Sequence, residues 1–180
     1  MMVMKQIIDE HINNKKITAI YTDSERTELF HVGVILCSMN DWILQYNIGT
    51  HGEYDGYSAE PIDGIYRIET ESLYLEKIKR LSKLHDQDKL LVEYRNIHPL
   101  EFILKKAKAE KKIVSVQVME EGNDLSGFID NYNDELVYMS QYDSFGNFDG
   151  ETVFMKKDII KICTDDADNR DVEYLARNEQ

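Results

Sequence analysis

An internal duplication constrains the fold of this 180-residue chain more than any other sequence feature, because each copy must form the same small unit. Residues 15–20 recur as residues 111–116, at a spacing of 96 positions. Residues 33–68 then match residues 127–162 at a spacing of 94, with seven identical pairs among 36. Unrelated segments would give roughly two identical pairs, so we expect both copies to share one topology.

A glycine-containing segment is the clearest echo between the copies. It reads Gly52-Glu53-Tyr54-Asp55-Gly56 in copy one and Gly146-Asn147-Phe148-Asp149-Gly150 in copy two. Asp-Gly pairs flanked by strand-like residues are typical of tight hairpins, because the turn needs positive φ angles that Gly and Asp tolerate. We therefore predict hairpin turns at Asp55-Gly56 and at Asp149-Gly150.

Each copy is predicted to open with a short helix and to continue in five strands. Apolar residues at helical spacing mark the opening helices near residues 7–12 and 99–107. A second helix follows the strands at residues 72–84, and residues 168–177 repeat its apolar pattern weakly. The strand-like segments of copy one are residues 17–21, 29–36, 42–46, 57–59 and 65–68.

This layout resembles the Sm-like, SH3-type small β-barrel, in which a helix precedes five bent strands. Trp42-Ile43-Leu44 stands where WYL domains, which are themselves Sm-like, carry Trp-Tyr-Leu. Copy two has Leu136-Val137-Tyr138 at the same place. Residues 62–65 and 156–159 are similar to the second Sm motif, a polar turn before the last strand.

The resemblance implies an α+β, mainly β fold: two tandem Sm-like or SH3-type five-stranded barrels with flanking helices. Sm-like proteins form rings that bind RNA, and WYL domains sense nucleotide or oligonucleotide ligands. We predict a first barrel with its N-terminal helix at residues 1–70, a helical linker at 71–97, a second barrel with its opening helix at 98–165, and a C-terminal helix or tail at 166–180.

The chain is acidic, because 21 Lys and Arg face 34 Asp and Glu for a net charge of −13. Such a field opposes nucleic-acid phosphates and anionic lipids, so we expect no strong generic nucleic-acid binding and no membrane binding. No apolar run approaches the roughly 18 residues of a membrane span and no secretory segment is visible, so we expect a cytoplasmic protein. One dense basic stretch, interpreted as a solvated helix face, comprises Lys105, Lys106, Lys108, Lys111 and Lys112.

Metal and cofactor signatures are weak. The five histidines lack zinc-ligand spacing relative to one another or to a cysteine. The segment with Asp143, Asn147, Asp149 and Glu151 is similar to a calcium loop but lacks the closing acidic ligand, so a solvated hairpin is favoured. We predict no metal site and no cofactor.

Nucleophilic catalysis has one candidate arrangement, Cys37 with His31 or His51 as its base. A lone cysteine at the end of an apolar strand is more often a packed small hydrophobe, and Cys163 does not complete a disulfide framework. We therefore predict two reduced thiols, with a disulfide as the alternative, and no enzymatic activity.

Aromatic residues of copy one suggest a binding site. We predict that the residues around one hairpin contact a ligand, because interleaved aromatics on a small barrel can grip peptides or stack bases. The alternative is that these tyrosines only pack against the core. The predicted binding residues are Tyr46, His51, Tyr54, Asp55 and Tyr57.

The main functional hypothesis is a non-enzymatic binding or adaptor protein that recognises a protein or a small ligand. Two alternatives stay open. One is an Sm-like or WYL-like regulator that is RNA-associated or senses a ligand, which would require a basic groove on an otherwise acidic surface. The other is an acidic inhibitor or immunity-type protein that covers a basic partner.

Overall fold

The computed structural model describes residues 2–85, 96–119 and 124–178. The chain divides into two compact units, Met1–Pro99 (unit 1) and Leu100–Gln180 (unit 2). Strands hold 41% of the described residues and helices 34%, so the described part of the protein is mainly β. Residues 86–95, which make up much of the predicted 71–97 linker, lie outside the described residues.

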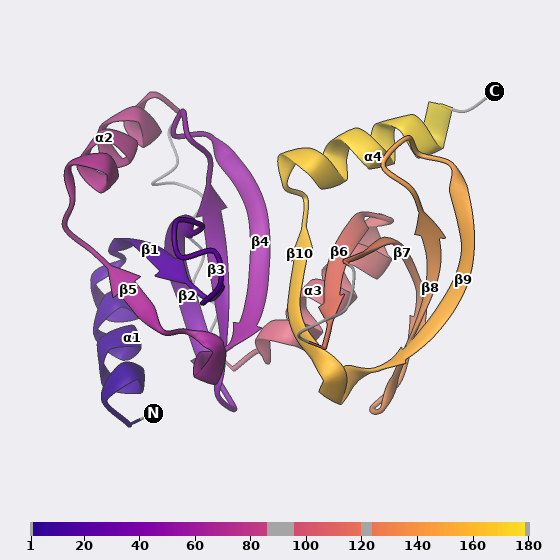
Figure 1. Cartoon of the computed structure of the whole chain (residues 1–180), viewed down its shortest axis with the longest axis horizontal. Helices are drawn as coiled ribbons and strands as arrows, with labels where there is room; N and C mark the ends of the chain where they lie inside the picture. Colours follow the sequence, from indigo (N-terminus) through magenta and orange to yellow (C-terminus); the bar gives the residue numbers. More distant parts are fainter. Residues whose placement is uncertain (1, 86–95, 120–123, 179–180) are drawn as a thin grey trace. The chain divides into compact units, whose positions relative to one another are not determined.

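Unit 1 is an antiparallel sheet of five strands with helices on its faces (Figure 1). The strands follow the order β5-β1-β2-β3-β4. Its elements are α1 (Met2–Asn14), β1 (Ile17–Tyr21), β2 (His31–Met39), β3 (Trp42–Ile48), β4 (Tyr54–Pro61), the 3₁₀ turn η1 (Ile62–Gly64), β5 (Arg67–Glu69), α2 (Leu73–Ser82) and η2 (Lys83–His85).

Unit 2 repeats this plan with the order β10-β6-β7-β8-β9. Its elements are α3 (Pro99–Glu110), β6 (Ile113–Val118), β7 (Leu125–Tyr132), β8 (Leu136–Tyr142), β9 (Phe148–Met155), η4 (Lys156–Asp158), β10 (Ile159–Thr164) and α4 (Ala167–Asn178). No described helix has the length and apolarity needed to cross a lipid bilayer.

The two sheets agree in register, strand pair by strand pair. In unit 1 Val34 lies opposite Tyr46, and in unit 2 Phe128 lies opposite Ser140, 94 positions later in both strands. Both second strands also carry a β-bulge at the same place, between residues 35 and 37 and between residues 129 and 131. The sequence repeat therefore corresponds to a repeat of three-dimensional structure.

Closed barrels are not confirmed. Among the described residues no pairing joins β4 to β5 or β9 to β10, so hydrogen bonds do not close either five-stranded sheet. In unit 1 the last strand is short, and its three residues pair with β1. The structure shows mainly β units with open antiparallel sheets and flanking helices.

The predicted position of the hairpin turn is wrong by several residues. The turn lies at Gly49–Gly52, where the Gly52 N–H donates to the Gly49 carbonyl and the Gly49 N–H donates to the Glu53 carbonyl. Asp55 and Gly56 lie inside β4, at a register shift opposite the end of β3. Positive φ at Gly56 serves this bulge, since an Asp-Gly pair suits a bulge as well as a turn.

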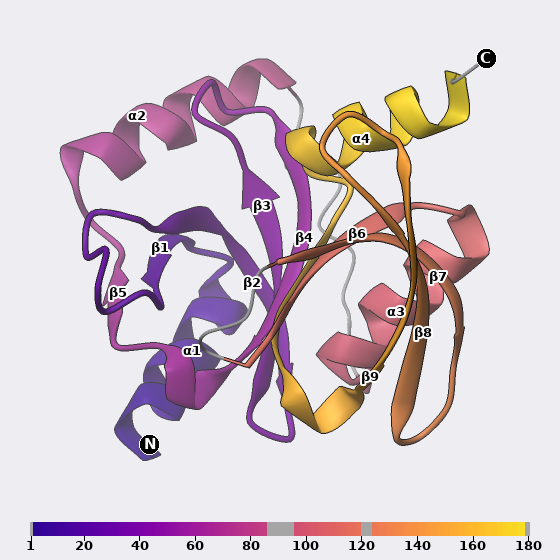
Figure 2. The ribbon, with the colours of Figure 1, turned by 45° about the vertical axis from the view of Figure 1, so that its right-hand side comes forward.

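The hairpins of both units turn against their last helix. Gly52 and Gly146 have φ angles of 84° and 83°. A Cβ on Gly52 would strike the backbone of α2 at Leu81, and a Cβ on Gly146 would strike α4 at Leu175. Figures 1 and 2 show α2 and α4 at these hairpin ends. Both positions therefore require glycine, because in each unit the hairpin backbone lies too close to the last helix for a Cβ atom.

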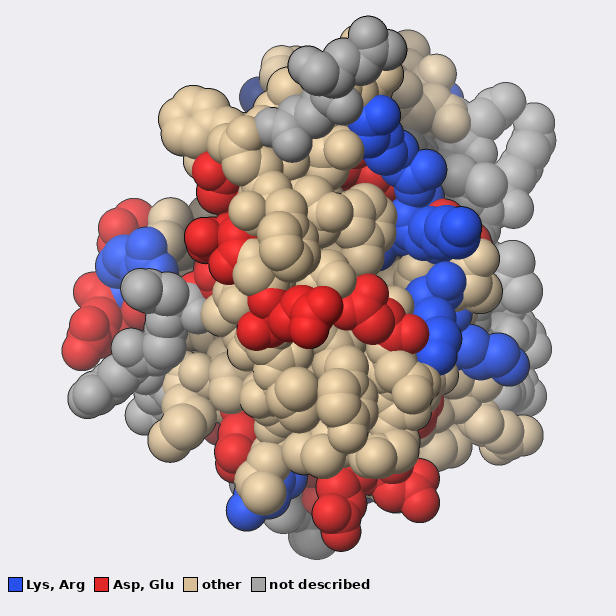
Figure 3. Space-filling view, turned by 90° about the vertical axis from the view of Figure 1, so that its right-hand side faces the viewer, with Lys and Arg blue, Asp and Glu red and all other residues tan. Residues whose placement is uncertain are grey.

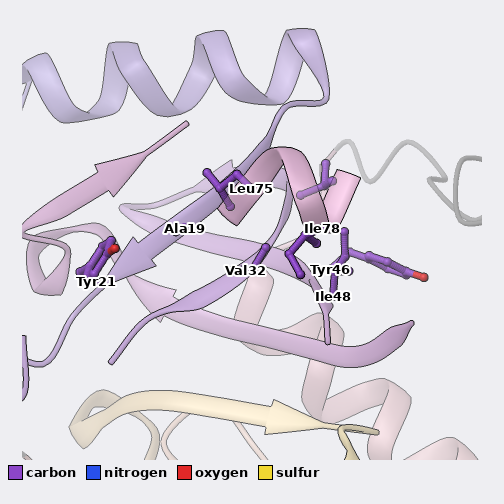
Figure 4. Packing of buried hydrophobic residues seen from close by; sticks show 8 residues of the cluster. Ala19, Tyr21, Val32, Tyr46, Ile48, Leu75 and Ile78 are labelled. Carbon is purple, nitrogen blue, oxygen red and sulfur yellow. The ribbon is translucent and has the colours of Figure 1, made fainter. Parts of the chain in front are cut away.

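Unit 1 has an apolar core on each face of its sheet. The core beneath α1 contains Ile8, Ile20, Ile35 and Ile43. The core beneath α2 contains aromatic and aliphatic side chains, and Figure 4 shows helix residues Leu75 and Ile78 beside the strand residues that they cover. Its buried members are Ala19, Tyr21, Val32, Val34, Tyr46, Ile48, Leu75 and Ile78.

Unit 2 buries one face of its outer strands and exposes the other. Side chains alternate along a strand, and Ile129, Val137 and Met139 are buried while their neighbours Asp130 and Tyr138 are exposed. Four apolar residues of α3 are also buried, Leu100, Ile103, Leu104 and Ala107, as their helical spacing predicts.

Candidate functional site

The predicted hairpin of copy one is built around three packed tyrosines. The Tyr46 ring is 1% exposed and lies 5.0 Å from the Tyr54 ring and 5.7 Å from the Tyr57 ring, measured between centroids. Tyr54 and Tyr57 are half-buried and pack against the core beneath α2. The structure therefore brings these three residues together, as part of the packing of unit 1.

The other two predicted binding residues have different surroundings. The side chain of His51 is 87% exposed at the hairpin tip, with Nδ1 3.8 Å from Glu53 Oε1 and 3.2 Å from Thr50 Oγ1. Asp55 is half-buried at the β4 bulge. Whether this hairpin binds a partner stays a prediction, because burial of Tyr46 gives it a packing role in any case.

The corresponding surface of unit 2 has a different chemistry. Tyr46 lies opposite Tyr57 in unit 1, and the equivalent pair in unit 2 is Ser140 opposite Glu151. Val32 of the unit 1 core likewise corresponds to Ser126. Small polar and acidic residues have replaced a packed core, so the same face of the repeat is available for another role.

Large apolar side chains lie exposed on this face. Tyr138 is 36% exposed, its partner Val153 is 53% exposed, and Phe148 is 57% exposed. Phe128, Tyr142 and Phe148 form a row of edge-to-face rings, with centroids 5.3 and 5.8 Å apart. We call this surface the open face of unit 2; it comprises Phe128, Asp130, Tyr138, Ser140, Tyr142, Phe148, Glu151 and Val153.

One end of the open face contains a shallow hollow of about 370 Å³, which we call the acidic hollow. Tyr138 and Val153 supply apolar surface, and Asp130 and Glu151 supply two carboxylates. The Ser140 hydroxyl donates to Asp130 Oδ2 over 2.9 Å and so holds one carboxylate in place. This hollow suits an apolar side chain that is next to a cation.

A second hollow of about 520 Å³ adjoins the first, because both are lined by Asp130 and Ser140. We call it the basic hollow. Its apolar lining includes Ala107, Phe128 and Tyr142, and its cations are Lys108 of α3, Lys111 in the turn after α3, and Arg177 of α4. The complete lining is Ala107, Lys108, Lys111, Phe128, Ile129, Asp130, Ser140, Tyr142 and Arg177.

The three cations of the basic hollow are held to different degrees. Arg177 lies with its guanidinium 5.9 Å from the Phe128 ring centre, and it pairs with Glu173 over 3.1 Å and donates to the Lys111 carbonyl. Lys108 donates to Asn131 Oδ1 over 2.8 Å. Lys111 is exposed and has no ion pair among the described residues.

Charge separates across this side of unit 2. Figure 3 shows Lys and Arg side chains in a column along one border of an uncharged surface, which a band of Asp and Glu crosses. The two hollows fit this division, since the cations of one belong to α3, to the turn after it and to α4, and the carboxylates of the other belong to β7 and β9. An extended ligand lying on both hollows would meet opposite charges at its two ends.

The predicted basic stretch divides in the structure. Lys106 pairs with Glu110, and Lys112 pairs with Asp165 and Glu173, so both side chains are used in local ion pairs. Lys108 and Lys111 instead line the basic hollow. These two side chains therefore differ from the interpretation of the stretch as a plain solvated helix face, because they line a hollow.

Sequence reasoning missed the open face because it compared the copies by similarity. The informative signal is the set of aligned positions at which the two copies differ in residue type. Tyr46 aligns with Ser140, and Tyr57 aligns with Glu151. The other face of the same strands of unit 2 still carries buried apolar residues. Replacement of large rings by Ser140 and Glu151 at neighbouring positions of one face alone is the signal that could have located the site.

The groups considered for catalysis do not gather at the open face. Burial raises the pKa of the Cys37 thiol to about 11, and its Sγ lies 3.8 Å from the Ile97 carbonyl oxygen. Both cysteines are free thiols. Across residues 2–85, 96–119 and 124–178, no three His, Cys, Asp or Glu side chains are grouped to hold a metal ion.

Asp143, from the segment similar to a calcium loop, has a structural role in the hairpin of unit 2. Its Oδ1 accepts from the backbone N–H groups of Phe145 and Asn147, both over 2.9 Å. The Asn147 side chain, together with these backbone donors, holds the pKa of Asp143 below its usual range.

No family model, curated protein or solved structure matches this chain.

Proposed function

We propose that this protein is a non-enzymatic binding or adaptor protein, in which the open face of unit 2 recognises a segment of another protein. The equivalent face of unit 1 is packed into the core beneath α2. The observation that supports this assignment most directly is the change of Tyr46 and Tyr57 in unit 1 to Ser140 and Glu151 in unit 2. At the first position a buried ring is replaced by a half-buried serine, and at the second a half-buried ring is replaced by an exposed carboxylate, so neither position of unit 2 packs a large side chain.

The apolar content of the open face supports a protein ligand. Tyr138 and Val153 face each other across two strands, and the rings of Tyr142 and Phe148 lie further along the same strand pair. Clustered exposed apolar side chains rimmed by charges are typical of protein interaction sites. Both hollows are shallow and adjoining, which suits an extended segment better than a compact metabolite.

The edge of unit 2 offers a second means of recognition. Strand β9 pairs with β8, and it is the last strand in the order of unit 2. A strand with one unpaired side can add an extended partner through backbone hydrogen bonds. Val153 and Met155, both exposed on β9, would give such a partner apolar contacts.

A second candidate function is the RNA-associated or ligand-sensing regulator suggested by the Sm-like and WYL-like resemblance. The basic hollow favours it, because Lys111 and Arg177 adjoin the Phe128 and Tyr142 rings. We rank it lower because the same hollow includes the carboxylate of Asp130, and residues 98–180 carry 10 basic and 18 acidic side chains.

Selection from a displayed random peptide library on the immobilised full chain tests the proposal. Selected peptides should bind the wild type, and their affinity should fall at least about tenfold in the variant Tyr138→Ala/Val153→Ala, which removes apolar contact area. Tyr66→Ala is the matched control, because Tyr66 is an exposed tyrosine of unit 1. Failure to select peptides, or equal effects of both variants, would contradict the proposal.

A further inference from the structure

The basic hollow has a ligand preference that can be stated from its chemistry. We infer that it accepts the acidic–aromatic end of a bound protein segment: one aromatic side chain with a carboxylate beside it. This inference rests on the proposed function, and it adds the class of the partner's residues and the direction in which charge runs along the segment.

The apolar part of the hollow selects the aromatic ring. Phe128 and Tyr142 stand with ring centroids 5.3 Å apart and planes at 87°, and both line the hollow with Ala107. A ring from a ligand can continue this edge-to-face row. The volume of about 520 Å³ holds a side chain of that size together with the group next to it.

The cations select the acidic group. Three positive side chains line the hollow against one carboxylate, Asp130. Glu173 offsets part of the charge of Arg177, whereas Lys111 is exposed and has no ion pair within the described part of the chain. A carboxylate placed between Lys111 and Arg177 would gain charge-assisted hydrogen bonds from both.

The adjoining acidic hollow sets the direction of charge along the ligand. Asp130 belongs to both hollows, and Glu151 belongs to the acidic one alone. A ligand acidic throughout would be repelled there, and a basic side chain would be attracted. The segment that fits both hollows is therefore acidic at its aromatic end and basic or neutral at its other end.

An RNA ligand fits these charges less well. Each successive nucleotide adds a phosphate, and the next phosphates along the strand would meet Asp130 and Glu151. The net charge of −13 also opposes a polyanion more strongly than it opposes a single carboxylate. A short acidic–aromatic motif avoids both penalties.

Displacement of a small fluorescent aromatic anion tests the inference on the full chain. The probe is 8-anilinonaphthalene-1-sulfonate, which combines aromatic rings with one negative charge. Saturable binding of the probe is expected, with amide signals of Phe128 and Tyr142 shifting in two-dimensional NMR spectra. Absence of saturable binding, or shifts confined to other residues, overturns the inference.

Matched charge reversals locate the anion contact. Lys111→Glu should weaken probe binding at least about fivefold, corresponding to the loss of one charge-assisted contact. Lys15→Glu is the control, because Lys15 occupies the equivalent corner of unit 1 with a φ of 49° against 53° at Lys111. Equal weakening by both reversals indicates a general charge effect and overturns the inference.

Four competitors then define the ligand class. A nonapeptide with Phe-Glu-Asp at one end and Lys at the other should displace the probe, whereas versions with Ala-Glu-Asp or Phe-Lys-Lys at that end should not. Displacement by oligouridine but by none of the peptides would overturn the inference in favour of RNA. If library-selected peptides depend on Tyr138 and Val153 but not on Lys111, the inference fails and the proposed function survives.

Discussion

Tyr46 and Ser140 occupy the same position of the two repeats and have different environments. Tyr46 is buried among the rings of Tyr54 and Tyr57, whereas Ser140 lines both hollows of the open face and donates to Asp130. One backbone position thus supports packing in unit 1 and a solvent-facing surface in unit 2. This division between scaffold and recognition surface determines which substitutions should affect stability and which should affect binding.

Replacing these two residues by alanine should separate the two roles. Tyr46→Ala removes a fully buried ring and should lower the free energy of unfolding by about 3–5 kcal/mol. Ser140→Ala removes an exposed hydrogen bond and should cost less than about 1 kcal/mol. Urea denaturation followed by circular dichroism measures both values. Similar losses for the two variants would contradict the assignment of unit 1 as the packed copy.

The half-buried rings of the predicted hairpin give an intermediate case. Tyr54→Ala and Tyr57→Ala should each cost about 1–3 kcal/mol, because part of each ring already contacts solvent. Thermal melts of the purified variants measure this loss. A cost below about 1 kcal/mol, combined with weakened binding of a library-selected peptide, would restore the hairpin as the binding site.

Glycine substitutions test the hairpin contacts with the last helices. Gly52→Ala and Gly146→Ala should each destabilise by at least about 2 kcal/mol, because a Cβ at positive φ would strike helix backbone. Gly64→Ala is the matched control, since a Cβ there meets no atom within 4 Å. We expect this control to be neutral or slightly stabilising, as measured by urea denaturation.

His11 should make stability depend on pH. Burial lowers the pKa of this imidazole from its usual 6.5, with Lys16 adding to the effect and Glu10 opposing it. Because the folded-state pKa is the lower one, the contribution is present above pH 6.5 and is lost as pH falls through the folded-state pKa.

His11→Gln should therefore flatten the profile of unfolding free energy against pH below neutrality. His51→Gln, at an exposed histidine, is the control and should keep the wild-type profile. Urea titrations at a series of pH values measure the difference. A wild-type slope that survives His11→Gln would contradict the role given to this residue.

The two last helices should respond differently to equivalent truncations. Leu75 of α2 packs in the apolar core, so Leu75→Ala should cost about 2–5 kcal/mol. Its counterpart in α4, Asn169, is buried and accepts from Ser115 over 2.7 Å, so Asn169→Ala should cost about 1–3 kcal/mol through unpaired polar groups. Calorimetric melts compare the two. An apolar replacement, Asn169→Leu, should not restore wild-type stability unless Ser115 is also replaced.

The amino-acid sequence by itself determined the repeat and the nature of its elements. Regular apolar spacing places the helices and strands, because each helix or strand must bury one face. The alignment of Gly52 with Gly146 also predicted equivalent geometry in the two units. Both positions have positive φ, and at both the backbone lies close to the last helix. Local residue preference sufficed for these features.

The position of the turn and the nature of the site were decided by tertiary structure. The turn lies at Gly49–Gly52, and Asp55-Gly56 became a bulge, because both places accept the same residue types and only strand register distinguishes them. The basic hollow combines Lys111, Phe128 and Arg177, which come from the turn after α3, from strand β7 and from helix α4. Periodicity along a chain records which side of an element is apolar, but it does not record whether another element covers that side. Packing decides this: it covers Tyr46 in unit 1, whereas in unit 2 it leaves Ser140 half-buried and Tyr138 exposed.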